Sequence, residues 1–209
     1  MKSRISALTP SHSFQTSNGS NLYFADYTDI DYASGTIPNR GARFSDVEFT
    51  DINSVHLHNR NSKLICFDRF PDFAFPKAKG GCHFQCECSI FPDRCHNDDW
   101  ILFIETKYAK TTSAAKNPSN AYLKKALIQI VRTVSEYRKK GVIPTGKPVY
   151  GIVSFPILTD QFNELLFQTK QDWVDRIKQK HNILIRGINS ATIRSEESLK
   201  LRPIVRNIP

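Results

Sequence analysis

The middle of the sequence holds two strongly apolar segments joined by a short polar one, and this unit restricts the possible folds most. Residues 82–91 (CHFQCECSIF) are a run of aromatic and small apolar residues, typical of a buried strand. Residues 99–109 (DWILFIETKYA) have four consecutive apolar residues, Ile101 to Ile104, at their centre. The connecting PDRCHND (92–98) contains the Pro, Asp and Asn residues that turns favour. Adjacent strands with so short a connection predict an antiparallel hairpin.

A long amphipathic helix follows the hairpin. Residues 121–140 place apolar side chains at the 3.6-residue period, with lysines and arginines on the other face, and Gly141 ends the pattern. On either side, the patterns predict strands at 63–70, 148–156 and 182–189, a helix at 45–57 capped by Ser45, and a helix at 159–181 capped by Thr159 or Asp160. This order of elements predicts an α/β fold in which helices flank a mixed central sheet.

The first part of the chain has a different composition. Residues 1–43 are rich in Ser, Thr, Asn, Asp and Gly, and no helical or strand period holds for long. This predicts an irregular N-terminal arm or a few short strands, ordered by aromatic residues such as Tyr23, Phe24 and Tyr27. Residues 44–209 are predicted to form one domain, because a chain of 209 residues with 40% hydrophobic side chains can build one core.

The second strand of the hairpin carries charged residues that need an explanation. Its alternation puts Glu105 and Lys107 on one face and Thr106 on the other. Buried charges are costly unless they have partners or hold a metal ion. If the turn is centred near residues 95–96, the residue opposite Glu105 is Glu87, the only acidic residue of the first strand.

Two carboxylates and a lysine are therefore predicted to converge across the hairpin. Oxygen ligands such as Glu87 and Glu105 hold hard divalent cations, which makes Mg²⁺ or Mn²⁺ the expected cofactor. Such a cation lowers the pKa of a bound water and neutralises charge that develops on a phosphate. Lys107 is predicted to orient or activate the nucleophile.

With these residues the sequence resembles the PD-(D/E)xK nuclease superfamily, which includes restriction endonucleases and many repair and defence nucleases. Glu105-Thr106-Lys107 matches the E-x-K of the family, and Glu87 stands on the preceding strand, where relatives usually carry an Asp. The resemblance covers roughly residues 45–156. It implies a restriction-endonuclease-like αβββαβ core, in which the helix 121–140 and the strand 148–156 follow the E-x-K strand.

Two Pro-Asp pairs offer other acidic residues. Asp93 is predicted to lie several residues along the hairpin from Glu105, and at about 3.3 Å per residue this is too far for one shared cation. Asp72 cannot be placed by the hairpin and stays a reserve candidate. The sequence favours Glu87 over both aspartates as the second carboxylate ligand of the cation.

Further polar residues are candidates through the resemblance. Several branches of the family use a polar residue of the helix that follows the E-x-K strand, and here Gln129 and Thr133 lie at one margin of the apolar face of 121–140. Gln129 is therefore added as a candidate catalytic residue. Glu48 is a candidate for a further carboxylate from the first helix. The alternative for Gln129 is a polar residue that simply borders the core.

The cysteines form a competing candidate site. Five cysteines in a chain without a secretion signal predict reduced thiols. Four lie within fourteen residues: Cys82, Cys86, Cys88 and Cys95. Together with His96 they could bind structural zinc, which takes such ligands in tetrahedral geometry. Cys82, Cys86 and Cys88 are predicted to share the strand face opposite to Glu87, where free cysteines equally serve as small buried hydrophobes.

The charge of the chain indicates its partner. Lys and Arg total 29 against 20 Asp and Glu, a formal net charge of +9, which favours a polyanion such as nucleic acid. Four lysines near the hairpin and on the basic helix face are predicted to follow the phosphate backbone: Lys110, Lys116, Lys124 and Lys125.

The sequence thus predicts a metal-dependent nuclease acting on nucleic acid, DNA in the first place, as a homodimer or with a partner protein that supplies targeting, as in defence or repair systems. The alternative is a catalytically inactive nucleic-acid-binding or scaffolding module of the same fold within a larger complex. A zinc-stabilised interaction domain is a third possibility. No apolar run approaches the length of a membrane helix, so a cytoplasmic protein without membrane association is expected.

Overall fold

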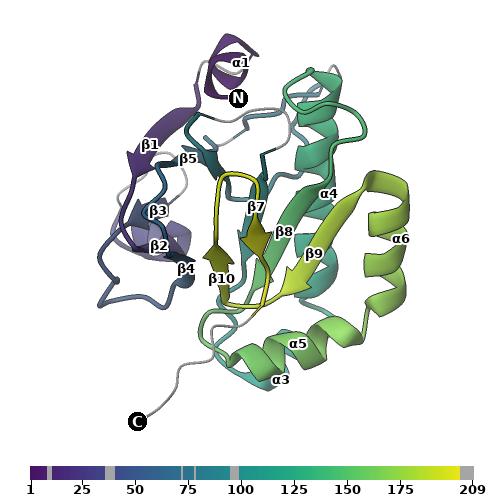
Figure 1. Cartoon of the computed structure of the whole chain (residues 1–209). Helices are drawn as coiled ribbons and strands as arrows, with labels where there is room; N and C mark the ends of the chain where they lie inside the picture. Colours follow the sequence, from purple (N-terminus) through teal and green to yellow (C-terminus); the bar gives the residue numbers. More distant parts are fainter. Residues whose placement is uncertain (9–10, 36–40, 72, 78, 95–98, 203–209) are drawn as a thin grey trace.

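The computed structural model describes residues 1–8, 11–35, 41–71, 73–77, 79–94 and 99–202. Within these residues the chain forms two mixed sheets flanked by helices (Figure 1). Sheet A has six strands in the order β1 (Ser13–Ser17), β5 (Ile65–Arg69), β6 (Cys88–Pro92), β7 (Leu102–Thr106), β8 (Val149–Ser154) and β9 (Ile183–Gly187). Sheet B has five strands in the order β11 (Leu199–Lys200), β10 (Ser190–Ile193), β4 (Val55–Asn59), β2 (Asn21–Asp26) and β3 (Ala42–Ser45).

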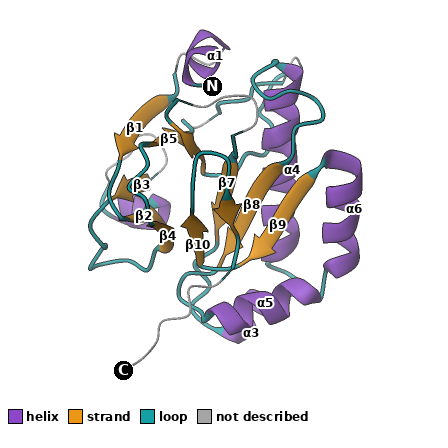
Figure 2. Cartoon of the chain, viewed as in Figure 1, coloured by secondary structure: helices purple, strands orange, loops and turns teal. Residues whose placement is uncertain are grey.

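Sheet A separates two hydrophobic cores. Phe103 of β7 packs in the core that helices complete, whereas its neighbours Leu102 and Ile104 pack in the core shared with sheet B, because successive strand residues face opposite sides. Figure 2 shows helices along one side of sheet A. The helices of this layer are α3 (Thr112–Lys116), α4 (Tyr122–Lys139), α5 (Asp160–Gln168) and α6 (Gln171–His181). The short helices α1 (Lys2–Leu8) and α2 (Thr28–Ala33) belong to the N-terminal part.

Most of the elements predicted on both sides of the hairpin are confirmed. The predicted strands at 63–70, 148–156 and 182–189 correspond to β5, β8 and β9, and the helix at 121–140 corresponds to α4. β6 and β7 pair antiparallel, as the hairpin predicts, and β7 and β8 pair parallel. Gly141 has a φ of +69°, the left-handed conformation that ends many helices at a glycine.

Three predicted boundaries are wrong. Residues 45–57 form no helix: Ser45 ends β3, and residues 55–59 form β4, whose alternating burial shows a period of two instead of 3.6. The helix predicted at 159–181 is divided into α5 and α6, and Thr169 ends α5 with its hydroxyl donating to the Leu166 carbonyl. The strand predicted at 82–91 begins only at Cys88.

Of the two alternatives for residues 1–43, the short strands are confirmed. β1 pairs antiparallel with β5 and so extends sheet A, while β2 lies between β4 and β3 in sheet B. Phe24 is fully buried, and Tyr27 is almost so. This part of the chain therefore contributes strands to both sheets.

Among the described residues, no helix combines the length and apolar character needed to cross a bilayer.

A buried polar network, which the sequence did not predict, joins β5 to α4. Asp68 is fully buried and accepts hydrogen bonds from the hydroxyls of Ser89 (3.0 Å) and Tyr137 (2.5 Å). His12 Nδ1 lies 2.8 Å from its other carboxylate oxygen. Burial, the charge of Asp68 and the hydrogen bond to it raise the pKa of Tyr137 far above its usual 10, so its hydroxyl keeps the proton. The network fixes α4 against sheet A.

Replacing Tyr137 with Phe is expected to lower the free energy of unfolding by about 1.5–3 kcal/mol, because a hydrogen bond to a buried charge is lost while the ring is kept. Tyr150→Phe is the matched control, since Tyr150 is a half-buried tyrosine of β8 outside the network. Urea unfolding followed by circular dichroism measures both. Equal losses in the two variants would contradict a special role for the network.

Candidate active site

Glu105 and Lys107 form an ion pair at the end of β7. Glu105 is fully buried, and the Lys107 ammonium donates a hydrogen bond to its Oε1. The backbone N–H of Lys107 donates to the Ser154 carbonyl at the end of β8 (2.8 Å), which fixes the residue just beyond the strand. The Lys107 side chain keeps 19% of its surface exposed, so the pair lies at the border of the core.

Glu87 directly precedes β6, and its charge acts on Lys107. In the ladder between β6 and β7, Cys88 pairs with Ile104, and Glu87 is the residue just before this pair. The Glu87 N–H donates to the Ile104 carbonyl (3.1 Å), and Glu87 is buried, with a relative exposure of 5%. Glu87 is therefore held beside the end of β7, although the paired strand residues begin only at Cys88.

The charges around Lys107 determine its protonation. Burial alone would lower its pKa, but the charge of Glu105 and the hydrogen bond to it, followed by the charges of Glu87 and Asp26, raise the pKa above the ordinary 10.5. Lys107 is therefore a cation at neutral pH. It can donate hydrogen bonds and stabilise negative charge, but it has no lone pair to act as a base.

Asp26 is a residue of this site that the sequence did not predict. It ends β2 in sheet B, and its N–H donates to the Tyr108 hydroxyl (3.2 Å), which itself donates to the Asn53 carbonyl (3.0 Å). Burial raises the pKa of Tyr108 far above its usual 10, so this hydroxyl stays protonated. The two sheets are thus joined directly beside Lys107, and a third carboxylate acts on its charge.

Gln129 and Thr133 of α4 hold the segment that leads into Glu87. The Gln129 side-chain amide donates to the Gln85 carbonyl (2.8 Å), and the Thr133 hydroxyl accepts from the Cys86 N–H (2.9 Å) and donates to the Gln129 carbonyl (2.9 Å). Both side chains therefore bind the backbone just before Glu87. In this position they orient the start of β6.

The two Pro-Asp pairs do not contribute to this arrangement. Asp93 directly follows β6, at the end opposite to Glu87, and its carboxylate pairs with Lys2 (3.2 Å). The five residues of β6 lie between it and Glu87, and these six residue steps span roughly 20 Å at the rise of a strand. Asp72 lies outside the described residues.

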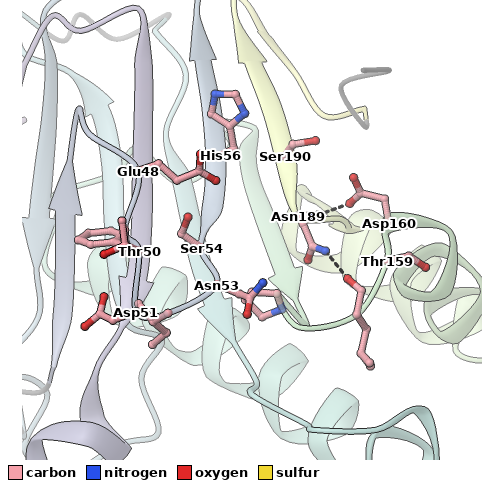
Figure 3. A pocket seen from close by; sticks show the side chains of 14 residues that line it. Glu48, Thr50, Asp51, Asn53, Ser54, His56, Thr159, Asp160, Asn189 and Ser190 are labelled. Carbon is pink, nitrogen blue, oxygen red and sulfur yellow. Dashed lines mark hydrogen bonds between the residues drawn. The ribbon is translucent and has the colours of Figure 1, made fainter. Parts of the chain in front are cut away.

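Glu48 lines a separate polar cavity of about 690 Å³ (Figure 3). It lies in the loop between β3 and β4 and not on the predicted helix, and Asp51 and Asp160 add carboxylates to the same cavity. Asn53, whose carbonyl accepts from Tyr108, connects the cavity to the site. The charges that act on the pKa of Lys107 come from Glu105, Glu87 and Asp26, so Glu48 stands apart from the ion pair.

The predicted common strand face for the cysteines is wrong. Because the strand begins only at Cys88, Cys86 packs in the core on the helix side of sheet A and Cys88 in the core between the sheets. Burial raises the pKa of the Cys88 thiol well above its usual 9, so it serves as a small hydrophobe. In the described part of the chain, no three His, Cys, Asp or Glu residues are grouped for a metal ion. Cys95 and His96 lie outside it.

The four lysines predicted to contact nucleic acid are exposed. Lys110 follows the E-x-K strand closely, and Lys116 ends α3. Lys124 and Lys125 lie in the first turn of α4, where the Lys124 ammonium lies 5.8 Å from the centre of the Trp173 ring. The four lysines lie along the segment from the end of β7 to the start of α4.

No family model, curated protein or solved structure matches the chain. Its function is therefore inferred from the arrangement of Glu87, Glu105, Lys107 and Asp26. At this site two buried carboxylates, those of Glu87 and Glu105, lie near the protonated amine of Lys107.

Proposed function

We propose that this protein is a metal-dependent nuclease that hydrolyses phosphodiester bonds in nucleic acid, DNA in the first place. One observation carries the proposal: the protonated Lys107 is bound to the buried Glu105 at the end of β7, and the charge of Glu87, which directly precedes β6, acts on the same ammonium. Carboxylates on neighbouring strands followed by a lysine are the arrangement that the resemblance to PD-(D/E)xK nucleases implies.

The order of elements in sheet A supports the same proposal. The antiparallel strands β5, β6 and β7 are followed by α4 and by β8, which returns parallel to β7. We propose that they form the βββαβ part of a restriction-endonuclease-like core. The opening helix of such a core is not formed by residues 45–57, which contain β4 instead. A glutamate also takes the place of the usual aspartate.

The two glutamates fit a hard divalent cation. Mg²⁺ keeps several waters and takes only one or two protein carboxylates besides substrate phosphates, so Glu87 and Glu105 suffice as protein ligands. Both are at least nine-tenths buried, and carboxylate oxygens are the ligands that such a cation prefers. A bound Mg²⁺ or Mn²⁺ would lower the pKa of a water and neutralise charge on the phosphate.

The protein's own groups complete the chemistry. The Lys107 ammonium can orient the attacking water and donate to the phosphate oxygens as negative charge develops on them. Its backbone bond to Ser154 holds it in place beside Glu105. Lys110, Lys116, Lys124 and Lys125 would bind the phosphate backbone on either side of the scissile bond.

A cleavage assay on supercoiled plasmid and on a labelled single strand tests the proposal. Purified protein with Mg²⁺ or Mn²⁺ should nick or cut at least one substrate, and EDTA should stop the reaction. Binding that weakens with salt, without cleavage under any metal condition, would favour the inactive nucleic-acid-binding module instead.

Thr133→Val is expected to slow cleavage by about tenfold or more, because groups that orient a metal ligand commonly contribute 10- to 100-fold. The substitution keeps the shape of the side chain but removes the acceptor for the Cys86 N–H. Ser135→Ala is the matched control, since the Ser135 hydroxyl donates to a carbonyl of its own helix, that of Val131. Initial rates of plasmid nicking are compared at equal melting temperature. Similar rates for both variants would show that α4 does not orient Glu87.

A further inference from the structure

Two phenylalanines are strongly exposed in the loop between β5 and β6. Phe73 keeps 74% and Phe84 70% of its surface accessible to solvent, more than most large apolar residues of the described chain. The backbone of Phe75 accepts from the His83 N–H (2.9 Å), and Pro76 and Cys82 form an isolated antiparallel bridge. The two arms of this aromatic loop (residues 73–77 and 79–85) therefore run side by side and carry one exposed ring each.

The loop is firmly held to the body of the protein. The buried side chain of Gln85 accepts from the Ala74 N–H (3.0 Å) and donates to the Pro71 carbonyl (2.9 Å). Phe75 is buried in the core beneath, and Gln129 of α4 binds the Gln85 carbonyl. The two exposed rings are thus presented on a fixed scaffold, which lowers the entropy cost of binding through them.

The backbone at Phe73 is strained. Its φ is +61°, in the left-handed region that bulky side chains rarely adopt. Such strain persists only where the surroundings enforce it, and it concentrates at binding and active sites. Here the bonds of Gln85 to the neighbouring backbone hold it. The strained conformation keeps the ring of Phe73 outside the core.

The tip of the loop is basic. Lys77 and Lys79 are exposed, and Gly80 and Gly81, with φ of +85° and +74°, turn the chain so that the Lys77 N–H donates to the Gly81 carbonyl (2.9 Å). Lysine is depleted from the centres of protein–protein interfaces, whereas aromatic rings beside lysines are typical of surfaces that bind single-stranded nucleic acid. The charge of the loop is complementary to a phosphate backbone.

We propose that the aromatic loop binds unpaired bases of single-stranded nucleic acid, with bases stacked on Phe73 and Phe84 and phosphates bound by Lys77 and Lys79. Bases within a duplex are already stacked on each other, so these rings select single strands or frayed ends. Phe84 precedes Glu87 by three residues, at most about 11 Å of extended chain, which places the stacked bases beside the cleavage site. The inference rests on the proposed function and specifies its substrate as single-stranded.

Fluorescence anisotropy with a labelled single strand and the matching duplex tests this directly. The full chain is used in EDTA, so that binding is measured without cleavage. The single strand is expected to bind more tightly than the duplex, and Phe73→Ala and Phe84→Ala should each weaken it by roughly 5- to 150-fold, the range of one base–aromatic stack. Phe84→Trp should bind like the wild type, because it keeps a ring for stacking.

Matched controls and alternative outcomes complete the test. Val47→Ala and Leu64→Ala remove exposed apolar groups elsewhere and should leave binding unchanged. Equal affinity for single strand and duplex, or unchanged binding by the phenylalanine variants, would overturn the inference. So would self-association that is lost in Phe73→Ala while single-strand affinity is kept. If single strands bind through the two phenylalanines but no metal-dependent cleavage occurs, only the proposed nuclease activity is refuted. If cleavage occurs but the phenylalanine variants bind normally, only the proposed role of the aromatic loop is refuted.

Discussion

Glu105→Gln is expected to reduce metal-dependent cleavage by at least about a hundredfold, the scale on which loss of a charge-stabilising group acts. The amide keeps the size of the side chain and an oxygen that can accept from Lys107, but it removes the negative charge that would hold the cation. The measurement is the initial rate of cleavage in Mg²⁺ and in Mn²⁺, at equal melting temperature.

Glu164→Gln is the matched control for this variant, because Glu164 is an exposed glutamate on α5. It should cleave at the wild-type rate. If Glu105→Gln retains the wild-type rate as well, the ion pair at the end of β7 is structural and any cleavage has another source.

Lys107→Met is expected both to abolish cleavage and to lower the free energy of unfolding by about 3 kcal/mol, because the buried carboxylate of Glu105 loses its ammonium partner. The double variant Glu105→Gln/Lys107→Met should recover most of this loss, since neither charge then remains, while its cleavage stays absent. Urea unfolding and plasmid nicking measure the two effects separately. A double variant that is less stable than Lys107→Met would contradict this account of the pair.

The pH dependence of the stability that the Glu105–Lys107 pair provides follows from the direction in which the pKa of Lys107 is shifted. Its folded pKa is raised above 10.5, so the stabilisation it provides is complete below the unfolded value and is lost as the pH rises through the folded pKa. The stability difference between the wild type and Lys107→Met, measured by urea unfolding at increasing pH, is therefore expected to be lost in alkaline solution, as the pH passes through the raised pKa of Lys107.

The hairpin and the helix after it could be predicted because apolar periodicity and turn residues indicate the same elements in this part of the sequence. The apolar residues of 121–140 predict the helix α4, and counting outward from the predicted turn gives the antiparallel pairing of β6 with β7. The same counting placed Asp93 at the far end of β6. Such arguments need only one turn and two strands, so they hold without knowledge of the whole fold.

Residues brought in by long-range packing could not be predicted. Asp26 reaches Lys107 only because sheet B lies against sheet A, and nothing in the sequence near it indicates this. Asp68 likewise joins His12, Ser89 and Tyr137 across large separations in the chain. The only local sign of Asp26 in the sequence is that its carboxylate directly follows the apolar residues of a short strand.

The prediction for the cysteines failed for a local reason. Residues 82–87 look like a strand because they are apolar, but the segment bends at Glu87, where its backbone carbonyl accepts from Phe70 and its N–H donates to Ile104. This bend moves Cys86 to the other core. It also frees the preceding residues to form the aromatic loop.

Binding of Mn²⁺ to the full chain, followed by electron paramagnetic resonance of the free ion, tests most directly whether Glu87 and Glu105 form one cation site. Glu87→Gln and Glu105→Gln are each expected to weaken Mn²⁺ binding by at least about tenfold. Glu48→Gln, in the separate cavity, should bind like the wild type. Wild-type affinity in both the Glu87 and the Glu105 variants would contradict the proposed metal site and, with it, the nuclease.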